Sequence, residues 1–268
     1  MNSPNSHFYT ASAALLASLN LVALPLAPVS AQAIAGVRHE IAQSQAKIKG
    51  GKVVYVPPKG VGTPKNTVGG LSRGECREIR CLMALMPNTD SGFDHFPQTI
   101  SAYPTFFFNA PKFSGEAEFR LYEVSSNASP KRIYKTNFPI ETQPGIISFR
   151  MPQNAPELRV GKFYRWEFTW NNATNSKCTG LVRRVELDRT VSQQLEKAKP
   201  IEKAAIYAKA GIWFEAVEAL AEARRDRPEA SELMVEWSDL LKSVGLDIIV
   251  LQPISPTSLS TQATRSGY

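Results

Sequence analysis

The chain has 268 residues, a formal net charge of +7, 43% hydrophobic residues and 21% charged residues. This composition indicates a globular protein rather than a disordered one. With three cysteines and three histidines, the chain has too few ligands at metal-binding spacings for a zinc site, and we expect no metal and no other cofactor.

The first 33 residues predict a secretory signal peptide. Residues 11–29 are almost wholly apolar and uncharged, and small residues stand at the −3 and −1 positions for cleavage after Ala31 or Ala33. The alternative is an uncleaved anchor, but polar and proline residues interrupt the run, whereas a spanning helix needs about 20 consecutive apolar residues. We therefore expect an exported protein, periplasmic or extracellular, with no transmembrane span in the mature chain and no nucleic acid partner.

Residues 34–72 are expected to form an extended basic linker. Glycine and proline recur along it, and only residues 53–56 are compatible with an edge strand. Residues 34–75 hold seven Lys or Arg against two Glu, a net charge of +5. This excess either keeps the segment soluble or attracts it to an anionic surface, such as lipid headgroups or acidic polysaccharide. The candidates for that contact are Lys47, Lys49, Lys52 and Lys59.

Residues 73–187 show the alternation of short strands. In the clearest case, Tyr164, Trp166, Phe168 and Trp170 alternate with charged or hydroxyl side chains. Alternation places one set of side chains on a buried face, so we expect the two tryptophans in the core rather than on a carbohydrate-stacking platform. Six or seven such strands separated by turns predict an antiparallel immunoglobulin-like β-sandwich.

Residues 188–250 change to a helical pattern. We expect helices over about 201–210, 213–225 and 228–243, with a short leading helix near 191–199 and a flexible tail over 251–268. A 34-residue internal echo with small residues at the helix crossings is typical of tetratricopeptide repeats. The fold class is therefore mixed, segregated α+β: the β-sandwich followed by a small tetratricopeptide-like segment.

So few helices cannot bury their apolar faces alone, because about three repeats are needed for a free-standing stack. The segment should therefore pack on the β-domain or on a partner. The candidates for that contact are Trp213, Phe214, Trp237 and Leu241. The alternative is that these side chains simply fill the helical core.

The sequence offers little catalytic chemistry. No phosphate-binding glycine loop is present, and Asp94-His95 near many serines does not define a triad without geometry. Cys81 as a nucleophile needs a basic partner and partial exposure. No pair of carboxylates stands out for glycoside hydrolysis. We therefore expect a protein that is not an enzyme.

The three cysteines, Cys76, Cys81 and Cys178, leave one thiol over after a single disulfide. Joining Cys76 to Cys178 closes a loop of about 100 residues and stabilises the fold by several kcal/mol in the chain-entropy model. Cys76–Cys81 is the local alternative.

Several motifs in order resemble the cyanobacterial exported family called domain of unknown function 928, over about Pro57–Pro253. They are Arg73-Gly-Glu-Cys76, Leu85-Met-Pro87, Tyr103-Pro-Thr-Phe106, Pro144-Gly-Ile146, Val160-Gly-Lys-Phe-Tyr-Arg-Trp166, Gly211-Ile-Trp-Phe-Glu-Ala216 and Trp237-Ser-Asp-Leu-Leu-Lys-Ser-Val-Gly-Leu246. The resemblance implies an exported cyanobacterial protein and brings no catalytic or binding residues. Cys81 departs from the family pattern, so the resemblance favours a Cys76–Cys178 disulfide with Cys81 as the spare thiol.

Three classes of function follow from these features. The first is a non-catalytic envelope protein that binds another protein or an anionic envelope polymer, since sandwiches and helical repeats offer surfaces. The alternatives are a cell-wall-directed hydrolase and a structural or stress-related periplasmic protein without a small ligand.

Overall fold

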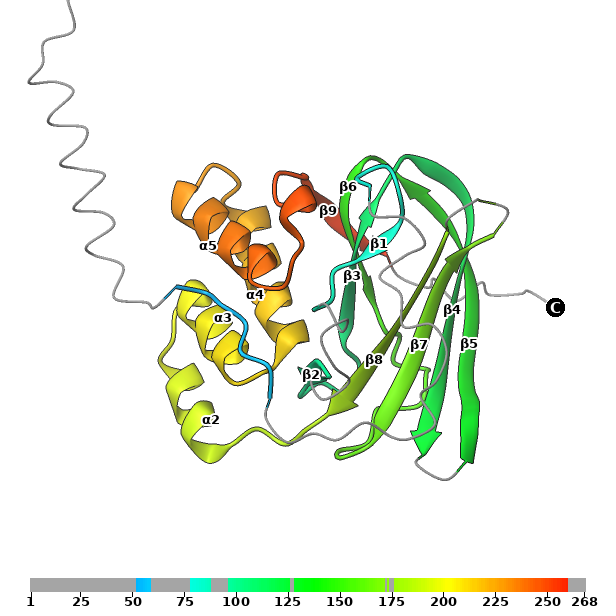
Figure 1. Cartoon of the computed structure of the whole chain (residues 1–268), viewed down its shortest axis with the longest axis horizontal. Coiled ribbons are helices and arrows are strands. Elements are labelled where there is room, and N and C mark those ends of the chain that lie inside the picture. The colour runs from blue at the N-terminus through cyan, green and yellow to red at the C-terminus, as the bar shows by residue number, and fades with distance from the viewer. Residues whose placement is uncertain are drawn as a thin grey trace, which may run out of the picture. The chain divides into compact units, whose positions relative to one another are not determined.

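The structure is a computed structural model and describes residues 52–58, 78–87, 96–125, 128–171, 173 and 176–259. These residues belong to one compact unit of the chain, Gly50–Tyr268. Two β-sheets and a layer of helices build it (Figure 1).

The larger sheet has the strand order β2-β8-β7-β4-β5, and the smaller one has the order β1-β3-β6-β9. The larger sheet consists of β2 (Gln98–Thr99), β8 (Lys177–Arg184), β7 (Phe163–Trp170), β4 (Phe113–Ser125) and β5 (Ala128–Thr142). The smaller sheet consists of β1 (Met83–Ala84), β3 (Thr105–Ala110), β6 (Gly145–Arg150) and β9 (Ile254–Leu259).

Both sheets are mixed. β2 runs parallel to β8 and β9 runs parallel to β6, whereas the other strand pairs are antiparallel. The mixed α+β class is therefore confirmed, but the purely antiparallel prediction is wrong at these edges. β9 reaches its edge only after the chain has passed through all the helices, and such a long connection allows a parallel strand.

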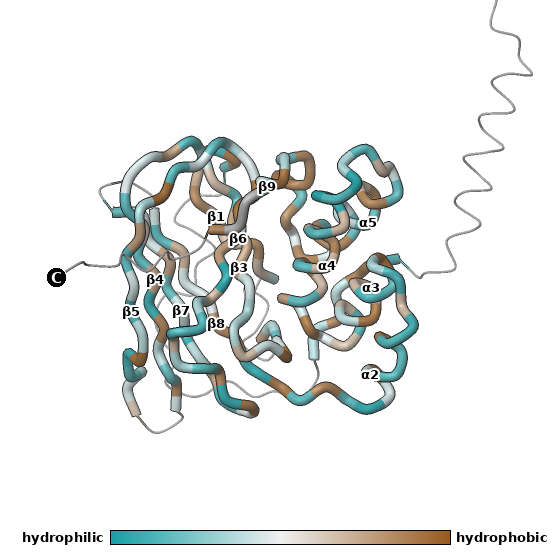
Figure 2. The backbone as a smooth tube through the Cα atoms, turned by 180° about the vertical axis from the view of Figure 1, so that it is seen from behind, coloured by the Kyte–Doolittle hydropathy of each residue, from teal (hydrophilic) through white to brown (hydrophobic). Residues whose placement is uncertain are grey.

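The inner faces of the two sheets pack on each other through aromatic rings. The ring centroids of Phe108 and Phe168 lie 4.3 Å apart, and those of Phe138 and Phe149 lie 5.2 Å apart. Trp166 and Trp170 are buried, which confirms their predicted core position. Alternation along β4 and β7 places apolar side chains on this inner face and polar ones on the outer face. Figure 2 shows hydrophobic and hydrophilic residues following one another along these strands.

Gly180 permits the close packing of Trp166. The two residues stand opposite each other on β8 and β7. A Cβ atom on Gly180 would overlap the indole ring of Trp166. The larger sheet therefore depends on the absence of a side chain at this position.

The central strands of the smaller sheet, β3 and β6, are buried on both faces apart from Arg150. Every residue of β3 is buried, which explains its uninterrupted Phe106–Phe108 run. Its second face meets the helical layer: α2 (Arg189–Glu196), α3 (Pro200–Lys209), α4 (Trp213–Asp226), α5 (Ser231–Lys242) and the short 3₁₀ helix η1 (Asp247–Ile249).

The helices agree closely with the sequence pattern. Asp188 caps α2 by accepting hydrogen bonds from the backbone N–H groups of Thr190 and Val191. Gly245 has a φ of +72° just beyond α5, as expected for a residue that ends a helix. α5 begins at Ser231 rather than near Pro228, because residues 228–229 form a turn.

The helical segment packs on the β-region, as expected. The indole nitrogen of Trp213 donates to the carbonyl of Leu85 at 2.9 Å, and the rings of Phe214 and Phe106 lie 5.5 Å apart. The Arg225 guanidinium donates to Ser148 Oγ at 2.9 Å. One hydrophobic cluster runs through both sheets and the helices.

The two terminal segments differ from their predictions. Residues 254–259, expected in a flexible tail, form β9, and the backbone N–H of Ile146 donates to Pro253 O at 2.7 Å. Residues 52–58, called the strap below, lie extended against α3 and α5 and pair with no strand. The edge strand considered for residues 53–56 is therefore wrong, because the strap N–H groups are bound by the side chains of Glu236 and Ser243 and by the backbone carbonyl of Ala208.

Candidate functional site

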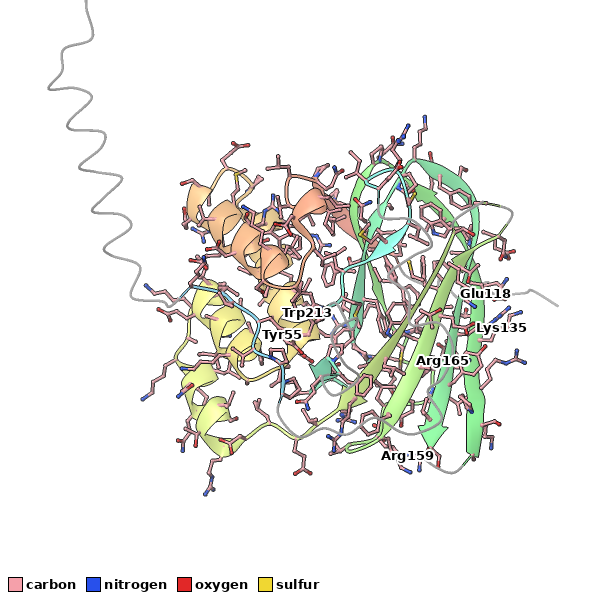
Figure 3. All side chains as sticks on the ribbon, viewed as in Figure 1. Tyr55, Glu118, Lys135, Arg159, Arg165 and Trp213 are labelled. Carbon is pink, nitrogen blue, oxygen red and sulfur yellow. The ribbon has the colours of Figure 1, made fainter. Side chains whose placement is uncertain are left out.

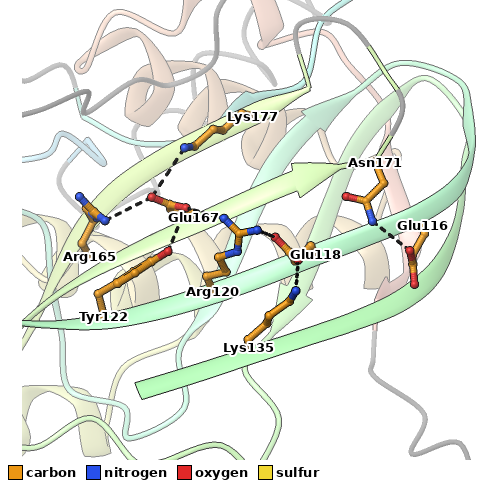
Figure 4. Close-up of polar contacts among 9 residues, drawn as sticks. All are labelled: Glu116, Glu118, Arg120, Tyr122, Lys135, Arg165, Glu167, Asn171 and Lys177. Atoms are coloured by element: carbon orange, nitrogen blue, oxygen red, sulfur yellow. Dashed lines mark hydrogen bonds and ion pairs between the residues drawn. The ribbon is translucent and has the colours of Figure 1, made fainter. Parts of the chain in front are cut away.

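The outer face of the larger sheet carries the densest group of interacting charges among the described residues. Arg120 on β4 stands opposite Glu167 on β7, and Tyr122 stands opposite Arg165. Lys135 on β5 (Figures 3 and 4) and Lys177 on β8 (Figure 4) flank this centre. These six residues and Glu118 are called the charged platform below.

Two buried carboxylates hold the charged platform together. Glu118 and Glu167 are each only 6% exposed. Glu118 forms ion pairs with Arg120 and with Lys135, whose Nζ lies 2.7 Å away. Ionised groups are rarely buried without such partners, because desolvation of a lone charge is costly.

Glu167 is surrounded by four donors. Its carboxylate oxygens lie 3.6 Å from Arg120, 3.4 Å from Arg165 and 3.7 Å from Lys177, and the hydroxyl of Tyr122 donates to it at 3.3 Å. Four basic groups thus converge on two carboxylates, which leaves an excess of positive charge.

The basic side chains of the platform remain accessible. The side chains of Lys135 and Lys177 are about half exposed, Arg120 is 34% exposed and Arg165 is 22% exposed. The Arg165 guanidinium stacks 4.5 Å above the Tyr122 ring. The bases are therefore oriented by the buried carboxylates while still facing solvent.

A row of carboxylates on α4 serves a different purpose. Glu215 Oε1 accepts hydrogen bonds from Thr99 Oγ1 at 2.6 Å and from the backbone N–H groups of Ile100 and Ser101 at 3.0 Å. Burial raises the pKa of Glu215. Glu218 accepts from Thr105 Oγ1 at 2.7 Å. These carboxylates join α4 to the sheets.

The described residues hold no group of three or more His, Cys, Asp or Glu side chains placed to bind a metal ion. His39, His95 and Asp94 lie outside the described ranges. Within those ranges, no helix combines the length and apolar character needed to cross a membrane.

The aromatic candidates for partner binding are buried within the chain itself. Trp213, Phe214 and Trp237 are each at most 4% exposed. Trp213 and Phe214 contact the β-region, and Trp237 lies under Arg224, whose guanidinium is 5.3 Å from its ring. The fold therefore buries these side chains instead of leaving them exposed as a partner surface, and the expected contact with the β-region is confirmed for Trp213 and Phe214.

Of the lysines proposed for anionic contact, the structure describes Lys52, whose Nζ lies 3.3 Å from Asp239. Lys47, Lys49 and Lys59 lie outside the described residues. The platform residues were not singled out from sequence. Their signal was the charged outer positions of two alternating strands, but that pattern does not show which strands are neighbours.

The predicted Cys76–Cys178 disulfide is wrong. Cys178 is a buried, reduced cysteine whose Sγ donates to Leu82 O at 3.6 Å. Cys81, expected to be the spare thiol, is disulfide-bonded. Cys178 faces inward from β8 within the core, where the sheet packing already restrains the chain.

A family model described as Domain of Unknown Function (DUF928) matches residues 68–254. The chain belongs to this family. The match confirms the resemblance seen in the sequence motifs, and it includes the whole charged platform of this DUF928 protein. No curated protein matches the chain.

Proposed function

We propose that this protein is an exported, non-catalytic binding protein that holds an anionic envelope polymer on its charged platform. The observation that carries the proposal is the convergence of Arg120, Lys135, Arg165 and Lys177 on two buried carboxylates. Exposed basic groups attract anionic ligands, and their attachment to buried partners reduces the conformational freedom lost on binding.

The geometry favours an extended ligand. The platform takes its side chains from four adjacent strands, β5, β4, β7 and β8, so it crosses the sheet rather than lining one loop. Neighbouring strands lie about 4.8 Å apart, so the basic groups form a row that matches a repeating anionic chain better than a compact small molecule. Guanidinium groups bind carboxylate or sulfate oxygens in a bidentate manner, and the Tyr122 ring offers an edge for sugar contact.

Two further features support this function. The basic N-terminal segment, including Lys47, Lys49, Lys52 and Lys59, adds positive charge, and the expected signal peptide brings the chain to the envelope. We also propose that the sheets form an immunoglobulin-like sandwich and the helices a tetratricopeptide-like segment, two fold types that commonly present binding surfaces.

The test measures binding of the mature chain to alginate, a polyuronate, with neutral dextran as the comparison. The Lys135→Gln/Lys177→Gln variant should bind alginate about tenfold or more weakly at low salt, since each basic group near an anionic surface contributes about 1 kcal/mol. Lys203→Gln/Lys209→Gln is the matched control, because these lysines are exposed on α3 and the net charge changes equally.

Each outcome bears on the proposal. Wild-type binding that weakens steeply between 0.1 M and 1 M salt, together with a loss confined to the platform variant, supports it. If alginate binding weakens equally in both variants, the attraction comes from net charge, which contradicts binding at the charged platform. No binding favours the structural alternative, and release of new reducing ends from the polymer favours the hydrolase.

A further inference from the structure

The strap lies across the helical layer as a bound peptide would. It contacts α3, α5 and the turn between α3 and α4, residues that are distant from it in the chain (Figure 1). Lys52 Nζ pairs with Asp239 at one end, and Pro58 packs against Gly211 at the other. The surface that receives the strap is called the strap site below. It consists of Ala208, Gly211, Trp213, Glu236, Asp239 and Ser243.

The strap site binds main-chain groups of the strap. Glu236, a buried carboxylate, accepts the backbone N–H of Val53 at 2.8 Å. Ser243 Oγ accepts the N–H of Tyr55 at 3.1 Å, and Ala208 O accepts the N–H of Val56 at 3.0 Å. Recognition through backbone groups fits any extended segment, with side-chain pockets adding specificity.

Alternate side chains of the strap supply that specificity. Val53 and Tyr55 are buried, whereas Val54 and Val56 are partly exposed. The Tyr55 ring meets Trp213 edge-on at 5.1 Å, and its hydroxyl lies 3.5 Å from Gly211 O (Figure 3). The strap site therefore selects an apolar residue and, two positions later, an aromatic one.

We propose that the strap site is a polypeptide-binding site, and that the strap is its internal ligand, which an extended segment of a partner protein replaces. The partner segment carries a basic residue, then an apolar residue, then an aromatic residue two positions on, followed by proline. This is the pattern of Lys52, Val53, Tyr55 and Pro58, the proline that packs against Gly211. The strap site lies on the helices, so its ligand binding is independent of the charged platform.

The strap also sets the affinity for such a partner. A ligand tethered within the same chain acts at an effective concentration of about the millimolar range, so it competes strongly with a free peptide. Weakening the strap should therefore expose a site that the wild-type chain largely conceals.

The experiment uses the full mature chain and a fluorescent heptapeptide with the sequence of residues 52–58. In fluorescence anisotropy, the Val53→Ser/Tyr55→Ser variant should bind the peptide at least about tenfold more tightly than wild type. Adding Glu236→Ala should reverse this gain in affinity, because the carboxylate that accepts the backbone N–H at the position of Val53 is lost. A peptide with serine at the two outward positions should bind as well as the original, whereas a peptide with serine at the two inward positions should not bind.

Equal binding of the inward-substituted and outward-substituted peptides overturns the proposal, as does a folded strap variant that binds no peptide. If the strap variant does not fold, hydrogen exchange of the wild-type chain tests whether the strap can detach from the strap site. The amides of Val53, Tyr55 and Val56 should then exchange through a local opening, with protection at least about 100-fold below that of β7 amides. Protection equal to that of β7 makes the strap a permanent part of the fold and overturns the proposal.

Discussion

Arg120 on β4 stands opposite Glu167 on β7, and its guanidinium also pairs with Glu118 on its own strand. One side chain thus joins the two buried carboxylates of the charged platform. Because each carboxylate is almost fully buried, the bridge both balances charge and fixes the direction of the basic groups.

Removing this bridge should destabilise the protein. Arg120→Ala leaves two buried carboxylates with fewer partners, and we expect the free energy of unfolding to fall by about 1–3 kcal/mol. Arg159→Ala is the control, since Arg159 pairs with Glu123 at 3.3 Å but is 66% exposed. Its loss should cost less than about 1 kcal/mol in urea unfolding. Similar losses in both variants would show that Arg120 is an ordinary surface residue.

Gly180→Ala should destabilise the larger sheet by about 1–3 kcal/mol, because the new methyl group overlaps the Trp166 ring. Trp166→Phe shortens the ring and should recover part of that loss in the double variant, relative to the sum of the single changes. Urea unfolding of all four proteins measures the coupling. If the losses in the free energy of unfolding are additive, the effect of Gly180→Ala does not arise from overlap with the Trp166 ring.

The stability of the fold should carry a pH dependence from Glu215. Burial raises its pKa in the folded chain above the ordinary value of 4.5. The folded state therefore favours the protonated form, and its contribution to stability is lost as pH rises from about 4.5 through the raised pKa. The charge of Glu215 also acts on the nearby Tyr207, whose pKa it raises together with burial.

Glu215→Gln tests this dependence, because the amide oxygen can still accept from Thr99 and the two backbone N–H groups. The stability of the variant relative to wild type should rise as pH increases from 4 to 7. Thermal unfolding across this range measures the difference, and a relative stability that falls with pH contradicts the assignment.

Peptide mapping without reduction should find Cys178 as an alkylatable thiol after unfolding. It should also find a linked peptide pair containing Cys81 and Cys76, the other cysteine of this three-cysteine chain. Because this loop is short, reduction should cost less stability than reduction of a 100-residue loop would. A peptide pair that contains Cys178 would contradict this expectation.

The strand faces and helices were predictable because their signals are local. Alternation over residues 164–170 correctly assigned Trp166 and Trp170 to the core, and α3 and α4 begin and end within a residue of their predicted limits. The turn at residues 228–229 shows the limit of such signals, since proline suits both a turn and the first turn of a helix.

The candidate site was less predictable because it depends on strand order. Glu118 and Glu167 are 49 positions apart in the sequence. Only the pairing of β4 with β7 brings together the basic side chains that surround these two carboxylates. The same reason hid β9 and the strap: each is a short segment that binds an element more than 100 residues away. Local composition indicates a flexible tail at residues 254–259 and is compatible with an edge strand at residues 53–56, and in neither case does it identify the distant segment that is bound.

The platform is tested most directly by lysine acetylation footprinting of the full mature chain with and without alginate. The account predicts that bound alginate slows acetylation of Lys135 and Lys177 at least about threefold and leaves Lys203 and Lys209 on α3 unchanged, because a bound polymer shields only the groups that it contacts. Uniform slowing of all four lysines, or slowing confined to α3, would contradict binding on the outer face of the larger sheet.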